Sequence, residues 1–137
     1  MKAFALWSLL CTGSFATLAG GYHAKLDSTP HRVAVVIDTS YEMQRALPGV
    51  LRRAQADFAD ARYTEVGVFS EKSRLAKDAR GFPSVSPRAW APRDFKRLAD
   101  GPLRDQLDGY DRVRVYTNAS SADVSGLPDS WQIVNPR

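Results

Sequence analysis

The sequence predicts a small α/β domain in three layers, with about four mostly parallel strands and flanking helices. Three observations predict this fold class. Residues 33–37 form an unbroken run of small and β-branched apolar side chains, typical of a strand covered on both faces. Residues 43–61 carry apolar side chains spaced by three and four, which indicates an amphipathic helix. A second apolar run at 65–70 follows, and the order strand, helix, strand predicts a right-handed parallel crossover.

The remaining elements are weaker in pattern. Residues 71–91 are charged and then broken by glycine and prolines, so we expect mostly loop. Short helices are expected at 92–98 and 103–107. Residues 112–117 alternate as a strand does, and 131–134 make the fourth strand.

Length and composition favour one domain and exclude several classes. The chain has 137 residues, of which 44% are hydrophobic and 25% charged, with a single cysteine. It is too apolar to be mostly disordered and too poor in cysteine to be a disulfide scaffold. The formal net charge is +4, but the basic side chains are spread along the chain among acidic ones. We therefore expect solvated faces and no nucleic-acid partner.

The first 21 residues have the layout of a secretory signal peptide. Lys2 is followed by an apolar stretch and then by small residues up to Ala19, so cleavage is expected after Ala19 or Gly21. The protein is then periplasmic or secreted. An uncleaved membrane anchor is the alternative, because the stretch approaches the ~20 residues of a membrane helix. That segment is the only membrane contact we expect.

Three further features concern the N-terminus, the start of the domain and one segment within it. Cys11 raises the alternative of a lipidated N-terminus, which the bulky Leu10 before it argues against. Residues 22–32 are polar and indicate a leader, so that the domain is expected at 33–137. Within the domain, the proline-containing segment 81–92 predicts either a rigid partner contact or a lid over the sheet edge.

Polar residues follow two of the expected strands. Ligands of open α/β sheets bind beyond the carboxyl ends of the strands, where the strand order reverses. If strands 33–37 and 112–117 are neighbours, the residues after them converge into an oxygen-rich site suited to Mg²⁺. The candidate ligands of the ion are Asp38, Ser40, Glu42 and Asn118, and the further ligand-binding candidates are Thr39, Thr117 and Ser120. Alternatively, Thr39 and Glu42 form a capping box that only starts the helix.

Residues 33–43, Val-Ala-Val-Val-Ile-Asp-Thr-Ser-Tyr-Glu-Met, resemble the opening of a von Willebrand factor A domain. By this resemblance Asp38 and Ser40 are the first two positions of a metal-ion-dependent adhesion site. Glu42 stands where the family has a second serine, and Asn118 stands where it has a later aspartate. The resemblance implies a truncated domain with a degenerate site, acting as an exported binding module for a protein or a cell-surface ligand.

Two other functions fit the same residues. Asp38 and Thr117-Asn118 also resemble the nucleophile and second motif of haloacid-dehalogenase-like phosphohydrolases, in which Asp38 would attack phosphorus. That family has an acid two residues after the nucleophile, where this chain has Ser40. The third interpretation is a structural scaffold without a small ligand. The sequence favours binding over catalysis.

Overall fold

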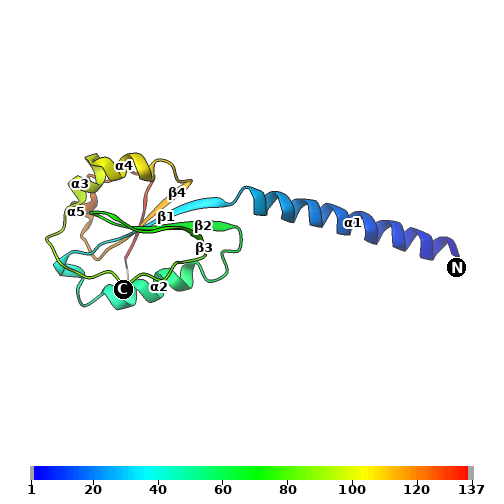
Figure 1. Ribbon diagram of the computed structural model, residues 1–137, viewed down its shortest axis with the longest axis horizontal. Coiled ribbons are helices and arrows are strands. Elements are labelled where there is room, and N and C mark those ends of the chain that lie inside the picture. The colour runs from blue at the N-terminus through cyan, green and yellow to red at the C-terminus, as the bar shows by residue number, and fades with distance from the viewer. Residues whose placement is uncertain (1, 136–137) are drawn as a thin grey trace. The chain divides into compact units, whose positions relative to one another are not determined.

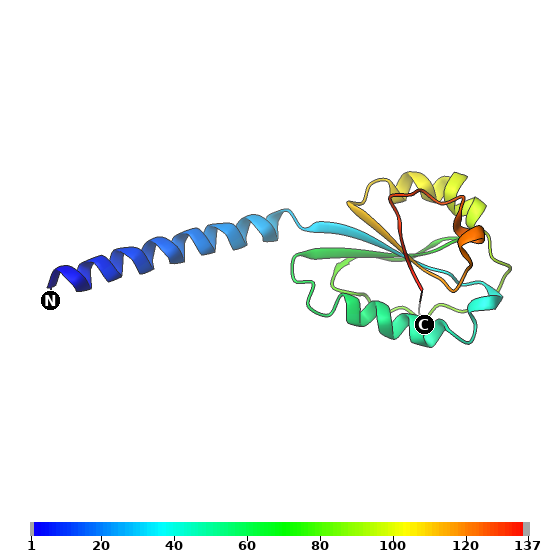
Figure 2. The same ribbon diagram turned by 180° about the vertical axis from the view of Figure 1, so that it is seen from behind.

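The computed structural model describes residues 2–135, with side chains from residue 4. The chain forms two compact units, Met1–Pro30 and His31–Arg137. The first unit contains one helix, α1 (Lys2–Ser28). The second contains a sheet with helices on both faces (Figures 1 and 2).

Helix α1 is long and apolar enough to cross a membrane, by length and composition, over Phe4–Ser28. Its 25 residues rise about 38 Å, more than the ~30 Å hydrocarbon core of a bilayer. The hydroxyls of Thr12 and Thr17 donate to helix carbonyls one turn earlier, so these polar groups are satisfied within the helix. A signal sequence near the N-terminus has the same character. The helix extends through most of the expected 22–32 leader.

The sheet has five strands where the sequence predicted about four. They are β1 (His31–Ile37), β2 (Thr64–Ser70), β3 (Arg74–Arg80), β4 (Arg112–Tyr116) and β5 (Gln132–Val134). Their order is β3-β2-β1-β4-β5. β1 is parallel to β2 and β4, and β4 is parallel to β5. The prediction of loop for 71–91 was wrong over β3, which pairs antiparallel with β2.

Apolar residues that alternate along β1 divide between two cores. Val33, Val35 and Ile37 pack with one core, which includes helix α2 (Leu47–Asp57). Ala34 and Val36 pack with the other, which includes α3 (Phe95–Asp100) and α4 (Pro102–Leu107). The helices thus cover opposite faces of the sheet (Figure 1). Burial on both faces explains why residues 33–37 of β1 are all apolar.

The expected helix at 43–61 is shorter and divided. A 3₁₀ turn, η1 (Tyr41–Met43), precedes α2, and Pro48 lies in the first turn of α2, where a missing N–H costs nothing.

The last helix, α5 (Ser121–Val124), is a single turn after β4. The connection from β3 to α3 begins at Gly81, whose φ of 74° favours glycine, and reaches the end of β1 through a bridge between Ser40 and Ala91.

Tyr116 joins β4 to α2, because its hydroxyl donates to Asp57 Oδ2 at 2.8 Å. Burial, followed by this hydrogen bond, raises the pKa of Tyr116 to about 12. Between pH 10 and 12 an unfolded tyrosine ionises while folded Tyr116 keeps its proton, so the free energy of unfolding falls as pH rises through this window. We expect Tyr116→Phe to flatten that decline in urea titrations at stepped pH. An unchanged slope would contradict this assignment.

Candidate functional site

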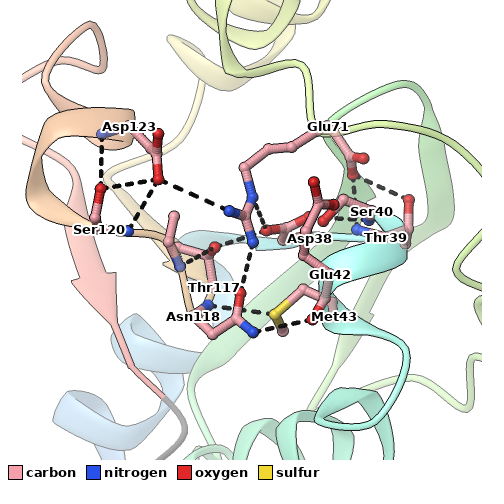
Figure 3. Close-up of polar contacts among 12 residues, drawn as sticks. Asp38, Thr39, Ser40, Glu42, Met43, Glu71, Thr117, Asn118, Ser120 and Asp123 are labelled. Atoms are coloured by element: carbon pink, nitrogen blue, oxygen red, sulfur yellow. Dashed lines mark hydrogen bonds and ion pairs between the residues drawn. The ribbon is translucent and has the colours of Figure 1, made fainter.

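The site lies at the carboxyl ends of β1 and β4, where the chain winds away in opposite directions. β1 connects through α2 to β2 on one side, and β4 connects to β5 on the other. Asp38 follows β1 and Thr117 follows β4. The Thr117 hydroxyl donates to Asp38 Oδ2 at 2.6 Å (Figure 3). The expected convergence of these two strand ends is therefore confirmed.

Asp38 is fully buried, and both of its carboxylate oxygens have partners. Oδ1 accepts from the backbone N–H of Ser40 at 2.9 Å. Oδ2 accepts from the Thr117 hydroxyl and from Nε of Arg93, the latter at 2.8 Å. Thr117 in turn accepts from the backbone N–H of Ala119 at 3.0 Å. A buried carboxylate needs such a hydrogen-bonded counter-charge to remain ionised at moderate cost.

Arg93 is the central residue of the site that sequence reasoning did not identify. It lies on the connection from β3 to α3, and its side chain is only 16% exposed. Nη2 donates to Asn118 Oδ1 at 2.5 Å, and Nη1 lies 3.9 Å from Asp123 Oδ2. One guanidinium thus links the ends of β1 and β4 with α5. The need of a buried aspartate for a cation predicts a basic partner, but it does not show which arginine supplies it.

Asn118 is the second strand-end residue on Arg93. Its amide Nδ2 donates to the backbone carbonyl of Glu42 at 3.0 Å, and its backbone N–H contacts Met43 Sδ at 3.2 Å. Glu42 itself is exposed. The Asn118 side chain therefore ties the end of β4 to η1 (Figure 3). It also ties the end of β4 to Arg93.

A second buried acid, Glu71, lies at the end of β2. It is fully buried and accepts from the backbone N–H and the hydroxyl of Thr39, at 2.9 and 3.0 Å. Lys72 pairs with Glu71 and lies 5.2 Å from the ring centroid of Trp90. The predicted capping role of Thr39 was wrong, because its hydroxyl is directed to Glu71. Sequence reasoning missed Glu71 because it placed this residue in a loop.

Ser120 has a local role. It is the N-cap of α5 and forms a capping box with Asp123. The Ser120 hydroxyl oxygen accepts a hydrogen bond from the backbone N–H of Asp123 at 3.3 Å. The Ser120 hydroxyl donates to Asp123 Oδ2 at 2.8 Å. Hydrogen bonds from the side chain and backbone of Ser120 lower the pKa of Asp123. Ser120 thereby holds ionised the acid that faces Arg93.

The arrangement does not fit Mg²⁺ as the sequence suggested. The Asp38 oxygen that such an ion would use is bonded to the Arg93 guanidinium, and Asn118 Oδ1 is bonded to it as well. A divalent cation bound to the same oxygen would be repelled by the positive charge of the guanidinium. Ser40 Oγ is buried without a partner.

Two aromatic side chains are exposed at this edge. Tyr41 is 58% exposed and Trp90 is 59% exposed. The Tyr41 backbone N–H donates to Ala91 at 3.0 Å, and the Trp90 backbone N–H donates to Thr39 at 3.2 Å. These bonds fix the segment 90–93 beside the end of β1. The aromatic pair and Arg93 therefore belong to one edge of the sheet.

Comparison with known proteins adds no family assignment. No protein-family model matches the chain, and neither the curated proteins nor the solved structures gave a match.

Proposed function

We propose that the folded unit is a protein-binding module of an exported protein, built as a truncated von Willebrand factor A-like domain. The strand order supports this proposal, because it follows the doubly wound order 3-2-1-4-5 except that β3 is reversed. The convergence of Asp38 and Thr117 at the switch between β1 and β4 supports it further. Ligands of such sheets bind at this edge.

The observation that carries the proposal is the pair of exposed aromatic side chains, Tyr41 and Trp90, at this edge. Within the described part of the folded unit, the exposed large apolar side chains are Tyr41, Trp90 and Ile133. Two of these three lie on segments joined by hydrogen bonds at the carboxyl edge. Trp, Tyr and Arg are the residue types that most often dominate protein interfaces. A protein partner therefore fits this edge.

Binding is proposed over catalysis because of the state of Asp38. A phosphohydrolase nucleophile must present a free carboxylate oxygen to the substrate. Asp38 is fully buried, and its two oxygens accept from Ser40, Thr117 and Arg93. Its neighbour two residues later is Ser40, which supplies no acid for a leaving group.

Export is proposed from helix α1. Its length and apolar composition suit a signal peptide or an anchor. As an anchor it would hold the folded unit at a membrane surface, and as a signal peptide it would release it. In both cases the module meets partners outside the compartment in which it is made.

Site-specific photo-crosslinking in the producing cells tests the proposed face. A benzophenone amino acid is placed at Tyr41, at Trp90 or, as the control, at Ile133, the other exposed large apolar position. We expect positions 41 and 90 to capture the same protein and position 133 not to capture it. Absence of an adduct at both edge positions, or equal capture at all three, would overturn the proposal.

A further inference from the structure

The feature that goes beyond the proposed function is the position of Arg93. A fully buried carboxylate must be matched by a positive charge, and removal of that charge leaves an uncompensated ion in the interior. Arg93 meets this need at Asp38 with Nε at 2.8 Å, and it contacts Asn118 through Nη2 at 2.5 Å. Its side chain is 16% exposed, and its guanidinium lies 5.7 Å from the ring centroid of Phe95. The guanidinium is therefore held on several sides.

We infer that Arg93 is the resident cation of this site. Its guanidinium joins the carboxyl ends of β1 and β4, where the sequence suggested Mg²⁺, and it also faces Asp123 of α5. The charge comes from the chain itself, so the fold and any binding at this edge need no divalent metal. This inference concerns the site alone and holds whether or not the proposed partner exists.

Arg93 and a metal ion compete for the same oxygens. Asp38 Oδ2 and Asn118 Oδ1 both accept from Arg93. Ser40 Oγ, which is fully buried and has no partner, is a further oxygen two residues from Asp38. Carboxylate, amide and hydroxyl oxygens are ligands suited to Mg²⁺ and Mn²⁺. Removing the guanidinium should therefore convert the site into one that accepts a dication.

The test compares the full chain in detergent micelles with Arg93→Ala and with Arg88→Ala, which removes the same charge from an exposed position on the same segment. Mn²⁺ binding is followed by loss of the free-ion signal in electron paramagnetic resonance, and stability by Tm. We expect Arg93→Ala to lower Tm by about 10 °C or more. We expect it to bind Mn²⁺ with an affinity about tenfold or more above any nonspecific binding by the wild type. Arg88→Ala should match the wild type in both measurements.

Added methylguanidinium provides a direct check. It should raise the Tm of Arg93→Ala and displace Mn²⁺ from it, and Asp38→Asn in the same chain should abolish both effects. Specific Mn²⁺ binding to the wild type would overturn the inference, as would an Arg93→Ala chain with no gain in Mn²⁺ affinity.

If Arg93→Ala does not fold, Arg93→Lys replaces it. Lysine keeps the charge but cannot span Asp38 and Asn118 in the manner of the planar guanidinium. We then expect a lowered Tm and no Mn²⁺ binding, and a stable Arg93→Lys chain that binds Mn²⁺ would overturn the inference. Failure of the crosslinking experiment would leave all these results unchanged, so the two proposals are separable.

Discussion

Thr117→Val is expected to lower the free energy of unfolding by about 2 to 4 kcal/mol. Valine has nearly the shape of threonine, so packing is conserved while the hydroxyl is lost. Asp38 then loses a hydrogen bond of 2.6 Å, and the backbone N–H of Ala119 loses its acceptor. Hydrogen bonds to a buried charge are among the stronger contributions to stability. Urea unfolding followed by near-UV circular dichroism measures the change.

Thr117→Ser is the matched control, because serine keeps the hydroxyl and removes only one methyl group. We expect it to cost about 1 kcal/mol. If Thr117→Val is no more destabilising than Thr117→Ser, the bond between Thr117 and Asp38 does not stabilise the site as described.

Gly67→Ala is the second substitution for which we expect a large loss of stability, about 2 kcal/mol or more. A Cβ at Gly67 in β2 would lie 2.3 Å from the Tyr110 hydroxyl and 2.5 Å from Asp78 Oδ1. These two groups are hydrogen-bonded to each other, and Asp78 also accepts from Arg32 at 2.8 Å. The Tyr110 ring packs edge-on against Phe69. The ring cannot move aside without breaking these contacts.

Gly49→Ala makes the same chemical change, but we expect it to raise the stability of the protein. A Cβ at Gly49 in α2 meets nothing within 4 Å, and alanine favours a helix by about 0.5 to 1 kcal/mol. Thermal unfolding of the two variants should therefore shift Tm in opposite directions. A Gly67→Ala protein as stable as the wild type would show that the space beside Tyr110 is not restricted.

The α/β class could be predicted because it rests on strong local patterns, whereas the pairing of β1 with β4 entered only as a condition that the structure meets. The run 33–37 is apolar on both faces, which is typical of a central parallel strand. β3 could not be predicted in this way. Residues 74–80 are mostly charged or small, and their side chains are exposed or half-buried at the sheet edge, so no alternation of burial marks them.

The same limit explains the outcome for the site. Asp38 and Thr117 follow recognisable strands, so topology alone brings them together. Arg93 lies 55 residues from Asp38, on a connection without periodicity, and no local pattern distinguishes it from the surface arginines. Thr39 and Glu42 match a capping box in sequence, but the buried Glu71 takes the Thr39 hydroxyl. Tertiary contacts therefore determine both the place of Arg93 and the partner of the Thr39 hydroxyl.

The position of β1 in the chain bears on how the protein is made. Only residues 29 and 30 separate α1 from β1, but the neighbours of β1 are residues 64–70 and 112–116. During synthesis the central strand therefore has no neighbouring strand until residues 64–70 are made, and it has both neighbours only after residues 112–116. Such distant pairings form slowly. This late pairing suits the export proposed above, because a chain whose central strand is not yet paired is easier to pass through a membrane than a folded domain.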